Sequence, residues 1–225
     1  MEIAFLLDSS ESAKTLLFVK QREFVLSLAK QIVQMRLKPH GRELRVRLAV
    51  LQYSSSVSVE HSFRDWQDPD TFEERVNAMV YIGHGTYSSY AVGNATRLFV
   101  EETKSDSVRV ALLMTDGADH PQSPNAVGAA AEMKARGVRL FAVGLSDRAR
   151  EGVNSAKLRS IASSPPSQHV LSLTDASLEK KLLKELVSAA ASRAESPRAL
   201  PLRTKQLNTV VNALTPCVRL ARNPS

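Results

Sequence analysis

Short runs of apolar residues recur along this chain, and longer segments with helical spacing separate them. Residues 3–7 (IAFLL) are apolar throughout, while 108–114 (VRVALLM) and 138–145 (VRLFAVGL) each carry a single arginine. Runs of this length are typical of strands that are buried on both faces of a sheet. Such strands need helices above and below them, so this pattern restricts the chain to an α/β fold.

Apolar residues at helical spacing, bounded by proline or glycine, predict the connecting helices. Residues 56–63 alternate more openly, which favours an edge strand joined to the preceding strand by a tight hairpin. The predicted strands are 3–7, 46–53, 56–63, 108–114, 138–145 and 169–173. The predicted helices are 17–37, 70–80, 88–102, 126–136, 149–162 and 177–191. Because strands that alternate with helices join in parallel through right-handed crossovers, we expect a doubly wound, mostly parallel, Rossmann-like sheet. It should have one antiparallel edge strand and helices on both faces.

The alternation of strands and helices ends near residue 192. Residues 1–192 are therefore expected to form one domain, and 43% apolar composition is enough for a core. After residue 192, six Lys or Arg residues and one Glu account for +5 of the net charge of +7. Residues 1–192 therefore have a net charge of +2. Their positive and negative charges are interleaved and form no basic stripe, which argues against a nucleic-acid partner. Residues 193–225 contain four prolines and no glycine, and predict a basic, disordered tail.

The location of the protein is left open by the sequence. No apolar run approaches the roughly 20 residues that cross a bilayer, so no membrane span is expected. The chain as given shows no secretory signal, which suggests either an intracellular protein or a piece of a longer secreted one. Its one cysteine, Cys217, excludes an internal disulfide and a cysteine-based zinc site in this sequence.

Two of the predicted buried strands run directly into a carboxylate. Asp8 follows the first strand, and Asp116 follows the fourth within Thr115-Asp116-Gly117. Ligands of open α/β sheets bind beyond the carboxyl ends of the strands. If these two strands are neighbours, both carboxylates reach the same rim of the sheet.

Hydroxyl groups lie in the same predicted loops. Ser10 and Ser12 follow Asp8 at alternate positions, a spacing that lets a turning loop aim its oxygens inward as calcium loops do. Thr86 lies in the glycine-bearing loop 83–88. Two carboxylates and three hydroxyls, without nitrogen or sulfur, select Mg²⁺, Mn²⁺ or Ca²⁺ over zinc or copper. Neutral hydroxyls leave the ion most of its charge, so a free coordination position would attract an outside carboxylate.

Each part of this pattern has a simpler interpretation. Ser10 or Ser12 can cap the first helix, residues 115–117 can form an ordinary turn, and residues 83–85 can form an ordinary loop. His84 is not expected to bind a metal. The joint arrangement at strand ends is more specific than any of its parts.

These residues resemble the metal-ion-dependent adhesion site of the von Willebrand factor type A domain family. The resemblance covers about residues 2–190. Its pattern is complete at Asp8, Ser10, Ser12, Thr86 and Asp116, and residues 137–144 (GVRLFAVG) are typical of the family's fifth strand. The segments AFLLDSSES and YIGHGTYSSYAV are most similar to collagen-type members, although the chain has no Gly-X-Y run.

The resemblance implies a binding module rather than an enzyme. Ser10, Ser12 and Thr86 would bind the ion directly, and Asp8 and Asp116 would act through water. The partner would be a matrix or cell-surface protein that offers a Glu or Asp, and the protein would be secreted or in the extracellular matrix.

Two alternatives stay open at this point. One is an intracellular scaffold of the same family with the same site. The other is a magnesium-dependent phosphatase of the haloacid-dehalogenase type, in which Asp8 would be the nucleophile. That enzyme family places a second Asp two residues later, where this chain has Ser10.

Overall fold

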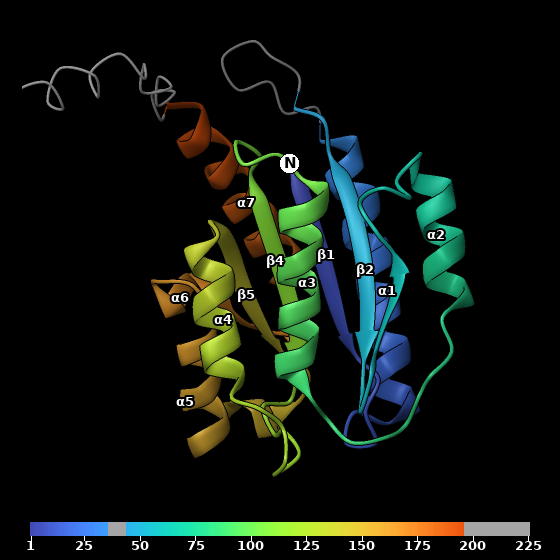
Figure 1. Ribbon diagram of the computed structural model, residues 1–225, viewed down its shortest axis with the longest axis vertical. Coiled ribbons are helices and arrows are strands. Elements are labelled where there is room, and N and C mark those ends of the chain that lie inside the picture. The colour runs from blue at the N-terminus through green and yellow to red at the C-terminus, as the bar shows by residue number, and fades with distance from the viewer. Residues whose placement is uncertain (36–43, 196–225) are drawn as a thin grey trace, which may run out of the picture. The chain divides into compact units, whose positions relative to one another are not determined.

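The computed structural model describes residues 1–35 and 44–195, in which strands and helices alternate (Figure 1). The strands are β1 (Glu2–Asp8), β2 (Arg47–Tyr53), β3 (Val57–His61), β4 (Arg109–Thr115), β5 (Val138–Gly144) and β6 (Val170–Ser172). The helices are α1 (Lys14–Gln34), α2 (Pro69–Ala78), α3 (Ser88–Glu102), α4 (Ala126–Ala135), α5 (Gly152–Ile161), α6 (Pro166–His169) and α7 (Leu178–Glu195), with a 3-10 turn, η2 (Asp147–Arg150).

The six strands form one sheet in the order β3-β2-β1-β4-β5-β6. All neighbouring pairs are parallel except β2 and β3, which pair antiparallel at one edge. This arrangement confirms the predicted doubly wound sheet with a single antiparallel edge strand. β1 and β4 lie at its centre, which explains why their sequences are almost continuously apolar.

The sheet is covered on both faces, and each face has its own apolar core. Alternate residues of β1 point to opposite faces, as strand geometry requires. Phe5 belongs to the cluster shared with α1, α2 and α7, whereas Leu6 belongs to the cluster shared with α3, α4 and α5. Figure 1 shows α3 and α4 in front of the sheet, with α1 and α7 behind it. All seven residues of β1 and all seven of β4 are buried.

The bounds of several predicted elements differ from the structure; the first helix, for example, begins at Lys14 rather than at residue 17. The predicted helix 149–162 is interrupted, because Glu151 is extended and Gly152 has a φ of +24°, so η2 and α5 are separate. The predicted strand 169–173 is shorter, because the short helix α6 continues to His169. The last helix continues to Glu195, beyond the predicted end at 191.

One expectation falls outside the part that the structure describes, namely the predicted tail after residue 195. The first helix ends within that part, because Met35 is extended after Gln34, so its predicted end at residue 37 is wrong. Within residues 1–35 and 44–195, none of the helices combines the length and the apolar character that crossing a membrane needs.

Candidate metal site

The two predicted carboxylates lie at the same rim of the sheet. β1 and β4 are hydrogen-bonded neighbours, with Leu6 opposite Leu113, so the strand ends lie side by side. This confirms that the two acid-bearing strands are adjacent. The side chains of Asp8 and Asp116 are both buried, with 0% and 1% of each residue exposed.

The loop after β1 gathers the two serine hydroxyls beside Asp8. Ser10 N donates to Asp8 Oδ1 at 2.9 Å, and Ser10 Oγ lies 3.1 Å from Ser12 Oγ. The residue at the N-cap of α1 is Ala13, and no side chain caps this helix. The simpler interpretation of Ser10 or Ser12 as a helix cap is therefore wrong.

The loop before α3 brings Thr86 to the same place from 74 residues away. Thr86 Oγ1 lies 3.3 Å from Ser12 Oγ. The backbone holds this loop in position, since Gly83 N donates to Ser9 O at 2.8 Å and Glu11 N donates to the carbonyl of His84 at 2.7 Å. The His84 side chain is exposed, so this residue contributes its backbone to the loop.

Gly83 and Gly117 allow the backbone conformations on which two of these loops depend. Gly83 has a φ of +80° and Gly117 a φ of +91°, in the left-handed region that favours glycine. A Cβ on Gly117 would lie 2.8 Å from the Cβ of Asn154. This turn allows Ala118 N to donate to Asp116 Oδ1 at 3.3 Å, which fixes one oxygen of that carboxylate.

The electrostatics of the site favour a bound cation. The pKa of Asp8 is raised to about 7, chiefly by burial and also by the negative charges of Asp116 and Asp119, while hydrogen bonds from Ser10 act in the opposite direction. Asp8 Oδ2 is buried and has no hydrogen-bond partner in the described part of the chain. A buried carboxylate oxygen without a partner is costly, and a divalent ion would satisfy it.

The set of donors suits a hard cation. The hydroxyls and carboxylates brought together are Ser10, Ser12, Thr86, Asp8 and Asp116, all of them oxygen donors. Within residues 1–35 and 44–195, no group of three His, Cys, Asp or Glu side chains is placed to hold a metal. A metal site at this rim therefore depends on the hydroxyls as well as the carboxylates.

One residue that supports the site, Gln21, could not be identified from the sequence. Gln21 lies on α1 and is fully buried. Its Nε2 donates to Asp8 O at 2.9 Å, and its Oε1 accepts from Asp8 N at 2.8 Å. Gln21 thus fixes the backbone at the point where β1 ends.

A second group, centred on Asp119, connects three elements around the site. Asp119 Oδ2 accepts from Lys157 Nζ at 2.6 Å and from Ser88 Oγ at 2.8 Å. Lys157 Nζ also donates to Gly117 O at 3.1 Å. These bonds join α5, the start of α3 and the loop after β4, and nothing in the spacing of the three residues along the chain indicates them.

Comparison with known proteins identifies the family. The model of the von Willebrand factor type A domain matches residues 2–188, and the chain belongs to this family. Human matrilin-3 is 31% identical over 176 residues, which are 76% of this chain and 33% of matrilin-3. The mouse collagen alpha-4(VI) chain is 27% identical over 163 residues, which are 72% of this chain and 6% of the collagen chain. The chain thus matches a third or less of these relatives' length.

Solved structures share the fold. Proximal thread matrix protein 1 from the mussel byssus matches with a TM-score of 0.66 and 22% identity, over 84% of this chain and 48% of that chain. Another structure of the mussel protein, at 23% identity and the same TM-score, has zinc in its MIDAS motif, the abbreviation for the metal-ion-dependent adhesion site.

Proposed function

We propose that this domain binds a protein partner through a divalent cation held at the rim formed by β1 and β4. The observation that carries the proposal is the buried, unpartnered Asp8 Oδ2 beside the serine and threonine hydroxyls. Ser10, Ser12 and Thr86 would hold the ion directly, and Asp8 and Asp116 would hold it through water, as the family resemblance implies. A cation there would supply the positive charge that attracts a Glu or Asp of the partner.

Magnesium is the ion we propose first, with manganese or calcium as substitutes. Oxygen-only ligands are the set these ions prefer. The mussel structure with zinc in its MIDAS motif supports a metal-binding role for such a site, although it concerns another protein.

The relatives support a role in the extracellular matrix. Matrilin-3 is a matrix protein by its name, and the collagen alpha-4(VI) chain agrees with the collagen-type resemblance of the sequence. We infer that this domain mediates adhesion in the matrix, with a matrix or cell-surface protein as its partner. Among collagen-type members, the segments AFLLDSSES and YIGHGTYSSYAV most resemble the type XXVIII collagen alpha chain, and this narrower identity is a prediction. The intracellular scaffold stays open as an alternative.

The phosphatase alternative is less well supported by the side chains at the rim. The second Asp of that mechanism is replaced by Ser10, whose Oγ lies 3.1 Å from Ser12 Oγ. Lys157, whose ammonium contacts the loop after β4, donates to Asp119 and to Gly117 O. We therefore propose a binding role without catalysis.

A solid-phase binding screen tests this function. Immobilised matrix proteins would be probed with wild-type protein and with Thr86→Ala, each in Mg²⁺ and in EDTA. We expect binding in Mg²⁺ that EDTA abolishes and that Thr86→Ala lacks while circular dichroism stays unchanged. Binding that survives both treatments would place partner recognition on another surface.

A further inference from the structure

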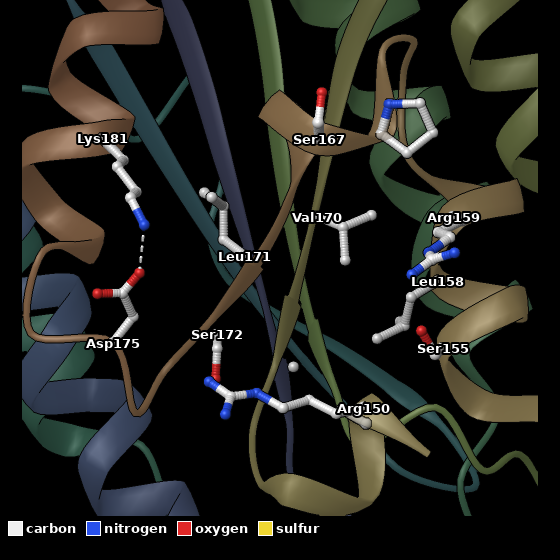
Figure 2. A pocket seen from close by; sticks show the side chains of 13 residues that line it. Arg150, Ser155, Leu158, Arg159, Ser167, Val170, Leu171, Ser172, Asp175 and Lys181 are labelled. Atoms are coloured by element: carbon white, nitrogen blue, oxygen red, sulfur yellow. Dashed lines mark hydrogen bonds and ion pairs between the residues drawn. The ribbon is translucent and has the colours of Figure 1, made fainter. Parts of the chain in front are cut away.

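A cavity of about 690 Å³ opens at the β6 edge of the sheet, between α5 and α7 (Figure 2). β6 is the last strand of the described sheet, so one of its sides has no neighbouring strand there. Apolar side chains of Leu158, Val170 and Leu171 line part of the cavity. None of the five proposed metal-site residues contributes to it, so this cavity is a separate surface.

The backbone of β6 has groups available for a further strand. Leu171 is in register with Val143, and Leu173 N donates to Gly144 O at 2.8 Å. The backbone N–H and C=O groups of Leu171 and Leu173 therefore face β5. The alternation of a parallel ladder turns the backbone groups of Val170 and Ser172 to the open side. Val170 N already donates to Pro166 O, and Ser172 O already accepts from Asp175 N.

Counting only bonds within residues 1–35 and 44–195, what remains on the open side is the carbonyl of Val170 and the amide of Ser172. One acceptor and one donor at the edge of a sheet are the groups that an extended peptide uses when it adds a strand.

Positive charge lines one side of the cavity. Arg150 and Arg159 are both exposed and both line it. Figure 2 shows Arg159 at the Val170 end of the strand and Arg150 at the Ser172 end. Arg150 Nη2 lies 3.4 Å from Thr174 Oγ1, and its Nη1 lies 3.6 Å from the highly exposed carboxylate of Asp147, a pairing that solvent weakens.

The opposite side of the cavity is close to neutral. Lys181 on α7 forms an ion pair with Asp175 at 2.6 Å, so its charge is balanced locally. Figure 2 shows the Leu171 side chain on this side of the strand and the Val170 side chain on the other. The cavity therefore has a cationic side toward α5 and an apolar, charge-balanced side toward α7.

We propose that this cavity binds an extended acidic segment of a protein partner as an additional strand beside β6. Side chains two positions apart in a strand point the same way and lie about 6.6 Å apart. Two acidic residues at such positions would face Arg150 and Arg159, and the residue between them would face Leu171. The basic segment 193–225 of this chain has the wrong charge for this site.

Fluorescence anisotropy with a labelled octapeptide of alternating glutamate and valine tests the proposal. We expect binding that persists in EDTA, which separates this surface from the metal site, and that weakens as salt is raised. The double variant Arg150→Glu/Arg159→Glu should bind the peptide at least tenfold more weakly, and should gain binding of a peptide of alternating lysine and valine. Arg97→Glu, an exposed charge reversal on α3, is the matched control and should leave binding unchanged.

Hydrogen exchange supplies a readout at the strand itself, because the glutamate–valine peptide should slow exchange of the Ser172 amide. Three results would overturn the proposal. They are loss of binding in EDTA, equal binding by the double variant, and arginine-dependent binding of a heparin oligosaccharide without binding of the peptide. The last result would reassign the cavity to a sulfated polysaccharide.

Discussion

Arg148 Nη1 lies 3.8 Å from Asp116 Oδ2, so a guanidinium from the loop after β5 reaches a carboxylate of the candidate metal site. The Asp116 side chain is 2% exposed and that of Arg148 is 60% exposed. A positive charge at this position competes with a cation for the same carboxylate. The candidate metal site is thus adjacent to a residue that should lower its affinity for a cation.

Replacement of Arg148 should therefore strengthen metal binding. Arg148→Gln removes the competing charge, and we expect the Kd for Mg²⁺ to fall a few-fold, in line with the ~0.2–1 kcal/mol typical of exposed ion pairs. Titration calorimetry at low salt measures this, with Arg97→Gln on α3 as the control. Weaker binding by Arg148→Gln would mean instead that Arg148 holds Asp116 in its binding position.

The raised pKa of Asp8 predicts how stability depends on pH when the protein is free of metal. The pKa is about 7 in the folded protein and about 3.9 in an unfolded chain. Between these values the folded state binds more protons, so the free energy of unfolding should fall as pH rises from about 4 to about 7.

Urea unfolding in EDTA at pH 5.5 and 7.5 measures this dependence, with Asp8→Asn as the comparison because its side chain does not titrate. The difference between wild type and variant isolates Asp8 from other titrating groups. A wild-type protein whose stability changes with pH just as that of Asp8→Asn does would contradict the prediction.

Loss of the Gln21 side-chain amide should destabilise the fold at the end of β1. Gln21→Leu keeps a similar volume but leaves the amide and carbonyl of Asp8 without these buried partners. We expect a loss of about 2–4 kcal/mol in the free energy of unfolding. The exposed Gln34 on the same helix provides the control, and Gln34→Leu should change stability by less than about 0.5 kcal/mol. Equal effects of the two substitutions would show that the bonds to Asp8 contribute little.

Because the C-terminal segment is predicted to be disordered, the domain should fold and stay stable without it, and deletion tests this. The predicted boundary is at residue 192, but α7 continues to Glu195, so the deletion should remove residues 196–225. We expect the melting temperature to change by no more than about one or two degrees, within the small effects typical of sites outside the core. A deletion of 178–225, which also removes the buried Leu182 and Leu186, should prevent folding. A large drop on removal of 196–225 alone would mean that this segment packs on the domain.

The arrangement of the central strands could be predicted from the sequence because it depends on local patterns. Apolar runs mark β1 and β4, and parallel strands deliver the residues after them to a common rim. Asp8 and Asp116 therefore lie at the same rim, as expected. The hydroxyls of Ser12 and Thr86 approach each other for the same reason, since both lie in loops at that rim.

The residues that support the site could not be predicted, because their roles depend on tertiary contacts. Gln21 occupies a core-facing position of α1, where a polar side chain has no local signature of its partner. Lys157 and Asp119 are 38 residues apart and meet because of how α5 packs. The interruption at Gly152 could not be predicted either, because a glycine near a helix start does not by itself reveal a positive φ.

The central claim is that Asp8, Ser10, Ser12, Thr86 and Asp116 hold one divalent cation. Titration calorimetry of EDTA-stripped protein with Mg²⁺ tests it most directly, with Thr86→Ala and Asp116→Ala as site variants and Thr71→Ala on α2 as the control. We predict one site in wild type and in Thr71→Ala, with a Kd of about 10⁻⁴–10⁻³ M as in weak extracellular calcium modules, and no binding by either site variant. Absence of binding to wild type at millimolar Mg²⁺ and Mn²⁺, or undiminished binding by both site variants, would contradict the claim.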